Sequence, residues 1–124
     1  MKPTVKHIEE IVSVLTEEEK LLLKDTIKHG EWGDSETCFL DENGNIEDSD
    51  TIGFCTNDAK LGGNFSGRKI SVMFRSLYKK LCPANHNQIG RHISHCSDWW
   101  GDGSGDMLFI RSEYYNAFQG WAKN

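Results

Sequence analysis

The sequence predicts a single α+β domain with an N-terminal helix pair, a small antiparallel sheet with hairpins and a short C-terminal helix. Apolar residues recur at helical spacing in several segments. Between these segments lie short β-branched and aromatic runs bounded by Gly, Asn and Asp. A chain of 124 residues is long enough to bury one core, so residues 1–124 are expected to form one domain.

Two helices are expected at the start of the chain, over residues 4–15 and 16–29. Thr4 is the candidate N-cap of the first. In the second, Thr16 and Glu19 match a capping box, three glutamates occupy the first turn, and Gly30 follows the last. The two helices are expected to pack along their apolar stripes, and the terminal helices together are a possible homodimer surface.

Residues 37–56 change to a strand-and-turn pattern. Asn43-Gly44 suits a type I′ hairpin turn, and a strand is expected over Thr51–Thr56. A third helix is expected over residues 67–81 with Ser66 as its N-cap, followed by a helix over 87–97 and a strand over 107–111. A last helix, capped by Ser112, contributes its apolar side chains Tyr114, Tyr115, Phe118 and Trp121.

Charge is strongly segregated along the chain. Residues 1–58 carry five Lys or Arg against fifteen Asp or Glu, whereas residues 59–97 carry seven cations and no carboxylate. Such a basic segment is typical of a surface that binds a polyanion. The alternative is that the two segments neutralise each other across the fold.

The segment 87–97, read as a helix, has one apolar and one polar side. Ile89, Ile93, Cys96 and Trp100 fall within about a 60° arc. The opposite side repeats donor side chains without carboxylates, as a DNA recognition helix does, although a merely solvated face has a similar composition. Its four residues are Gln88, Arg91, His92 and His95.

The element order over residues 16–111 resembles the winged helix-turn-helix fold of DNA-binding domains. The resemblance implies that the 87–97 helix enters the major groove and that the stretch GDGSGD at 101–106 forms the wing tip. Asp102 and Asp106 make this tip acidic, so it is not expected to touch phosphate. Phosphate contacts are expected instead from Arg68, Lys69, Arg75, Lys79 and Lys80.

Motifs of metal and nucleotide chemistry are incomplete. The stretch GGNFSGRK at 62–69 has Arg68 and Lys69 where a P-loop needs Lys and Ser or Thr. The run from Asp41 to Ile52 lacks the Gly and the Glu of a calcium loop. Cysteine and histidine crowd into residues 82–96 without the spacing of a zinc site. The four cysteines, irregularly spaced, are expected to be free thiols. No cofactor is expected.

The sequence therefore predicts a DNA-binding domain that takes duplex DNA, a small transcriptional or DNA-associated regulator rather than an enzyme. The alternative is a protein-interaction module of the same fold, with its partner surface on the acidic N-terminal helices and the aromatic C-terminus. No run approaches ~20 apolar residues and the first ten lack a secretory segment, so a cytoplasmic location and no membrane partner are expected.

Overall fold

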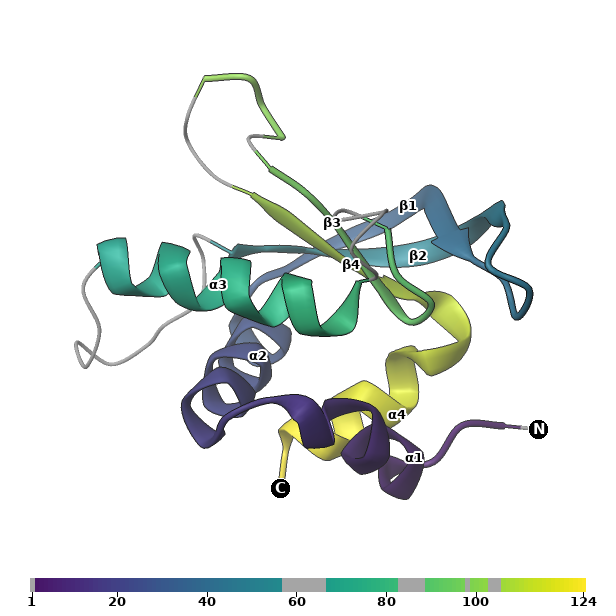
Figure 1. Ribbon diagram of the computed structural model, residues 1–124, viewed down its shortest axis with the longest axis horizontal. Helices are drawn as coiled ribbons and strands as arrows, with labels where there is room; N and C mark the ends of the chain where they lie inside the picture. The colour runs from purple at the N-terminus through teal and green to yellow at the C-terminus, as the bar shows by residue number, and fades with distance from the viewer. Residues whose placement is uncertain (1, 57–66, 83–88, 98, 103–105) are drawn as a thin grey trace.

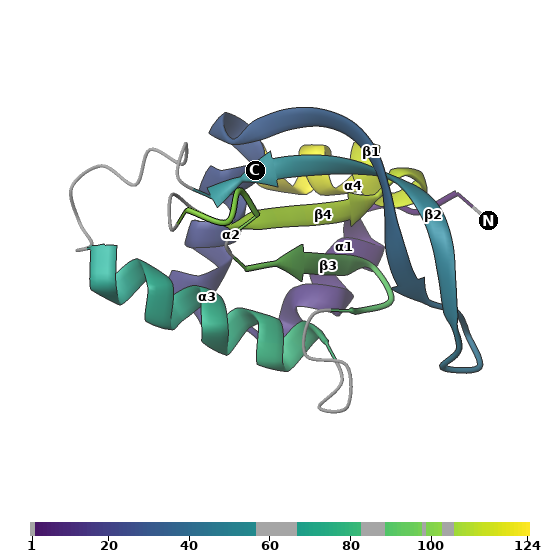
Figure 2. The same ribbon diagram turned by 90° about the horizontal axis from the view of Figure 1, so that it is seen from above.

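The computed structural model describes residues 2–56, 67–82, 89–97, 99–102 and 106–124, which form four α-helices, one 3₁₀ helix and a four-stranded antiparallel sheet. The strand order is β1-β2-β4-β3. Helices α1, α2 and α4 lie beneath one face of the sheet, and α3 runs along its β3 side (Figures 1 and 2). The predicted α+β class is confirmed. The elements are α1 Val5–Ile11, η1 Val12–Val14, α2 Glu17–His29, β1 Glu31–Leu40, β2 Ile46–Cys55, α3 Gly67–Leu81, β3 Ile93–Cys96, β4 Met107–Arg111 and α4 Ser112–Ala122.

The first two helices begin at the predicted caps. The Thr4 hydroxyl accepts from the N–H of His7 at 3.3 Å. At α2, the Thr16 hydroxyl accepts from the N–H of Glu19 at 3.1 Å, and the Glu19 carboxylate accepts from the N–H of Thr16 at 2.8 Å. This reciprocal pair satisfies two N–H groups that the helix leaves without partners, and it confirms the predicted capping box.

The β1–β2 hairpin is longer than predicted and turns differently. Asp41 and Asn45 pair across the turn, and the N–H of Gly44 donates to the Asp41 carbonyl at 3.1 Å. Gly44 has φ +82°, and the Asp41 carboxylate accepts from the N–H groups of Asn43 and Asn45. The predicted two-residue type I′ turn is therefore wrong, because the Asp41 side chain holds a wider loop that places the glycine after the turn.

The sheet curls until the end of β1 reaches β3. The N–H of Leu40 donates to the Gly90 carbonyl at 3.0 Å, and the Ser94 hydroxyl donates to the Cys38 carbonyl at 2.8 Å. We call the face opposite α1, α2 and α4 the concave face. It encloses a small apolar cluster made of Phe39, Cys55, Met107 and Phe109.

The main core lies between the sheet and the helices. Alternate residues of β4, Leu108 and Ile110, project into it while their neighbours face the concave side. On the α3 side, the rings of Tyr78 and His95 stack with centroids 3.5 Å apart. The largest fully buried side chains of this core are Ile8, Leu22, Leu23, Phe54, Leu77, Ile93, Leu108, Ile110 and Phe118.

The predicted helix over residues 87–97 is wrong. Ile93–Cys96 form strand β3, which pairs antiparallel with β4. Ile93 and His95 face the helices, whereas Ser94 bonds on the concave side to β1. The side chains of this segment alternate between the two faces of the sheet instead of following the helical period of 3.6 residues. The strand forms because pairing with β4 satisfies the backbone hydrogen bonds of this segment. The described residues therefore contain no recognition helix, and the predicted helix-turn-helix is absent from them.

The C-terminal helix buries two of its four aromatic side chains and leaves Tyr114 and Tyr115 half-buried. Phe118 and Trp121 are 0% and 4% exposed, so they cannot form the aromatic partner surface considered above. Ser112 is the first helical residue instead of the cap, and no side chain caps this helix.

Two predicted features lie wholly or partly outside the described residues, namely Ser66 and residues 103–105 of the tip at 101–106. The four cysteines are free thiols, of which Cys55 and Cys82 are buried. None of the described helices is long and apolar enough to cross a membrane.

Candidate functional site

Four of the nine predicted DNA contacts line one groove. Lys79 and Lys80 come from the last turn of α3, whereas Arg91 and His92 come from the bend that leads into β3. We call this the basic groove. Its volume is about 370 Å³, and none of its lining residues is a carboxylate. The lining residues are Ile11, Val14, Lys79, Lys80, Leu81, Cys82, Arg91 and His92.

The other predicted contacts are dispersed. Arg75 is exposed one turn before Lys79, so the two lie on the same side of α3. Lys69 pairs with Glu18 of α2 at 3.3 Å, in an exposed ion pair. His95 is 9% exposed and stacked on Tyr78, so it cannot reach a ligand in solvent. Arg68, as a side chain, and Gln88 lie outside the described residues.

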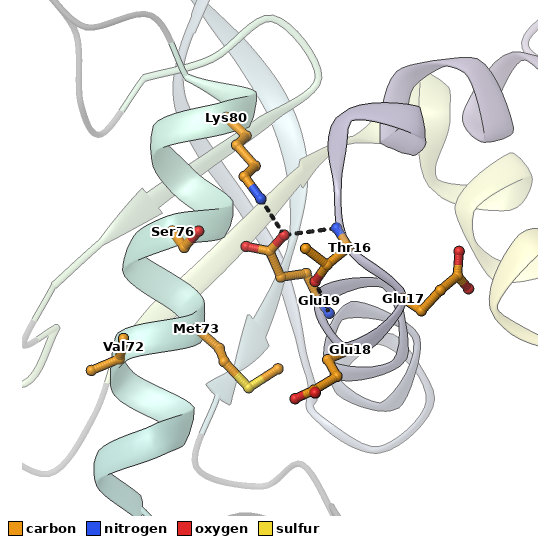
Figure 3. A pocket seen from close by; sticks show the side chains of 8 residues that line it. All are labelled: Thr16, Glu17, Glu18, Glu19, Val72, Met73, Ser76 and Lys80. Atoms are coloured by element: carbon orange, nitrogen blue, oxygen red, sulfur yellow. Dashed lines mark hydrogen bonds and ion pairs between the residues drawn. The ribbon is translucent and has the colours of Figure 1, made fainter.

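Lys80 is occupied by a buried partner, Glu19. The ammonium lies 2.5 Å from the carboxylate, whose residue is 4% exposed (Figure 3). Burial by itself raises the pKa of Glu19, but hydrogen bonds from Lys80, the Thr16 N–H and Ser76 outweigh it and hold that pKa at about 2. One charge of the groove is neutralised by α2, whereas Lys79 and Arg91 form no ion pair with any carboxylate in the part of the chain that the structure describes.

The pKa of the His92 imidazole depends on its burial and on the charges around the groove. Burial, followed by electrostatic repulsion from Arg91, His7 and Arg111, lowers the pKa of His92 from 6.5 to about 4. Its ring meets Tyr114 edge-on at 4.8 Å, which holds the imidazole in place. His92 is therefore neutral at pH 7, in a region where positive charge opposes its protonation.

A second pocket of about 590 Å³ adjoins the groove and shares Arg91 and His92 with it. Here the charges are mixed, because Arg111 pairs with Glu47 and lies 3.8 Å from Glu113. The excess of positive charge thus belongs to the basic groove and not to its neighbour. The second pocket is lined by His7, Leu40, Asp41, Glu42, Asn43, Glu47, Arg91, His92, Arg111, Glu113 and Tyr114.

An exposed tryptophan surface was not predicted from the sequence. Trp32, Trp99 and Trp100 are 61%, 45% and 38% exposed. Trp100 meets Trp32 of β1 at 5.7 Å between ring centroids, and Trp99 packs on Phe109 of the concave cluster at 5.4 Å. The adjacent pair Trp99-Trp100 beside a glycine-rich stretch was the available signal, since two large apolar residues in a loop seldom both find a core position.

The described residues hold no group of three His, Cys, Asp or Glu side chains placed to bind a metal ion. Burial raises the pKa of Cys82, the thiol in the groove, to about 11, so it is protonated at neutral pH and a poor nucleophile. No protein-family model, curated protein or solved structure matches the chain.

Proposed function

We propose that this chain binds nucleic acid through the phosphate backbone, with the basic groove as the contact surface. The observation that carries the proposal is the groove lining, which holds cations and no carboxylate. Burial is the largest cause of the lowered pKa of His92, and repulsion from Arg91, which lines the same groove, adds to it and supports the proposal. A bound phosphate would relieve this repulsion.

The groove offers side-chain donors rather than backbone donors. It lies at the C-terminal end of α3, where the helix dipole is negative and the free backbone groups are carbonyls. Anion binding therefore depends on Arg91 and Lys79, with Arg75 extending the contact along the helix. Arginine can hold two phosphate oxygens at once, which makes Arg91 the main contact.

This form of the proposal does not include base readout. Because the described residues contain no recognition helix, the side chains of Arg91, His92 and His95 do not form one surface that could read bases in the major groove. The resemblance to a winged helix then rests only on the order of the other helices and strands. We expect binding with little dependence on sequence, as phosphate contacts position a ligand without specifying bases. A regulatory role in transcription would then require a partner that supplies sequence selectivity.

Fluorescence anisotropy with a labelled mixed-sequence DNA duplex tests the proposal. Three phosphate contacts predict a fall in affinity of about 40-fold between 50 and 200 mM salt, and Arg91→Ala should reduce the salt slope by about one contact. Lys28→Ala, which removes an exposed cation from the far end of α2, is the matched control. Equal affinity of the Arg91 and Lys28 variants would refute the proposal, as would no binding at 50 mM salt.

The pH dependence provides a second measurement. Since a phosphate near His92 favours the imidazolium, the His92 pKa should rise when duplex is added, and binding should tighten as pH falls from 6 toward 4. Imidazole chemical shifts in NMR titrations with and without duplex measure this directly. A His92 pKa that stays at about 4 in the complex would place the DNA elsewhere.

A protein-interaction module remains a second candidate, favoured by the exposed tryptophans. Exposed aromatic clusters of this kind are typical of protein interfaces, where Trp contributes more than most residues to affinity. This surface adjoins strand β1, whereas the basic groove lies beside α3 across the sheet. One function does not exclude the other.

A further inference from the structure

The outer edge of β1 has open backbone positions. Alternate residues of a strand direct their N–H and C=O groups to the same side, and Leu40 directs its N–H away from β2, toward Gly90. Glu36 and Asp34 have the same parity. Among the described residues, none forms a backbone hydrogen bond to them on that side, and β1 is an edge strand of the sheet (Figure 2).

The hairpin that presents this edge is acidic. From Glu31 to Cys55 the chain carries eight carboxylates and no Lys or Arg. Asp34 and Glu36 are exposed, and Glu36 lies directly across from Asp50 of β2, which is also exposed. Like charges placed side by side on a sheet repel one another, so the edge favours a neighbour that supplies cations.

The same edge begins with an aromatic contact. The register of β1 and β2 shifts between Glu31 and Gly33, and Gly33 has φ +150°, so Trp32 is the extra residue of a β-bulge. In contact with Trp100, the Trp32 ring marks the concave side of the edge. A strand added here would meet carboxylates on one face and indole rings on the other.

We propose that the edge of β1 at Asp34 and Glu36 binds an extended segment of a partner protein that carries Lys or Arg at alternate positions and adds to the sheet as a further strand. Main-chain hydrogen bonds to β1 supply the affinity, and cross-strand pairs with the two carboxylates select for cations. Apolar residues between the cations face Trp32 and Trp100. Arg and Lys can also stack on these rings.

Two other occupants fit this edge less well. Pairing with a second copy of the chain would place Asp34 and Glu36 of one copy beside those of the other, so carboxylates would face carboxylates. Nucleic acid would bring phosphates against the same side chains. A basic protein segment is the occupant whose charge complements the edge, and this proposal is independent of binding in the basic groove.

A synthetic nine-residue peptide that alternates Lys and Val is the probe, and tryptophan fluorescence at 20–50 mM salt is the first readout. We expect saturable binding that Glu36→Pro weakens at least tenfold. Proline removes an N–H that points away from β2, so the β1–β2 ladder stays intact. The double variant Asp34→Lys/Glu36→Lys should weaken binding by at least as much. Glu9→Lys, an exposed charge reversal on α1, is the matched control and should change affinity less than twofold.

A peptide with N-methyl groups on alternate amides tests strand addition without altering the protein. Methylation of the amides that face β1 should abolish binding, whereas methylation of the intervening amides should leave it. Equal binding of the two methylated peptides would mean that charge alone attracts the segment, and would overturn strand addition. So would failure of the unmodified peptide to bind, or concentration-dependent dimerisation lost in the Glu36→Pro variant. Duplex binding by Arg91 is measured separately, so failure of one proposal leaves the other standing.

Discussion

Replacing Lys80 by methionine should lower the free energy of unfolding, because it leaves the buried Glu19 carboxylate without its ion-pair partner. Glu19 has a folded-state pKa of about 2 against an ordinary value of 4.5, and it is 4% exposed. A shift of about 2.5 pH units corresponds to about 3.4 kcal/mol of stability. The hydrogen bond from the Thr16 N–H remains in the variant, so we assign about 2–3 kcal/mol of this to Lys80 at pH 7.

The sign of the pH dependence follows from the lowered pKa. A carboxylate whose folded pKa is depressed contributes its full stability above pH 4.5 and loses it as pH falls toward 2. At pH 3.5 the contribution in the unsubstituted protein is already about 2 kcal/mol, so the deficit of Lys80→Met should shrink by roughly 1 kcal/mol. Urea unfolding at the two pH values measures this difference.

Two further variants make the Lys80 experiment decisive. Glu19→Gln keeps a side-chain acceptor for the Thr16 N–H, and adding it to Lys80→Met removes the unpaired buried charge, so the double variant should be more stable than Lys80→Met alone. An equal deficit at pH 7 and 3.5, or a double variant less stable than Lys80→Met, would refute this account of the pair.

Three other outcomes are expected. Burial holds the pKa of His95 at about 4, below the usual 6.5, so stability should fall by up to about 3 kcal/mol as pH drops from 6.5 to 4, and His95→Gln should flatten that decline in urea titrations. Gly90→Ala would place a Cβ 2.3 Å from the Ile93 carbonyl oxygen, so thermal unfolding should show a loss of about 2 kcal/mol or more. Thr16→Ala removes the acceptor for the Glu19 N–H and should cost about 1 kcal/mol in the same assay, whereas an unchanged midpoint would contradict the capping assignment.

The helices that the sequence predicted correctly are those whose ends are specified by neighbouring residues. The capping box of Thr16 and Glu19, the glutamates of the first turn and Gly30 all lie within α2 or beside it. Local hydrogen bonds fix these boundaries whatever the rest of the chain does. The turn after Leu40 was located for the same reason, although its type depends on the Asp41 side chain.

Residues 87–97 could not be assigned from local pattern. Ile89, Ile93 and Cys96 fit a helical stripe, and Ile93 with His95 also fits the alternation of a strand. Pairing with β4, which is separated from β3 in the sequence by residues 97–106, decides between them. A histidine was also read as a solvent-facing donor, whereas the stacking of His95 on Tyr78 makes it a core residue.

Four of the nine predicted DNA contacts lie together, although one of the two helices expected to carry them is absent from the described residues. Lys79, Lys80, Arg91 and His92 were expected to lie together on two packed helices, and they do line one groove although the second helix is a strand. Proximity along the chain after α3 was sufficient to bring them together. The pairing of Lys80 with Glu19 could not be foreseen, because those residues are 61 positions apart.

The hairpin tip brings the carboxylates Asp41, Glu42 and Glu47 into the second pocket, which shares Arg91 and His92 with the basic groove. A polyanion that approaches the groove is therefore repelled by these carboxylates over a range set by the ionic strength. In dilute buffer, where the Debye length is about 30 Å at 0.01 M, the repulsion extends well beyond the pocket. At physiological ionic strength that length shrinks to about 8 Å, and each charge acts mainly on its immediate neighbours.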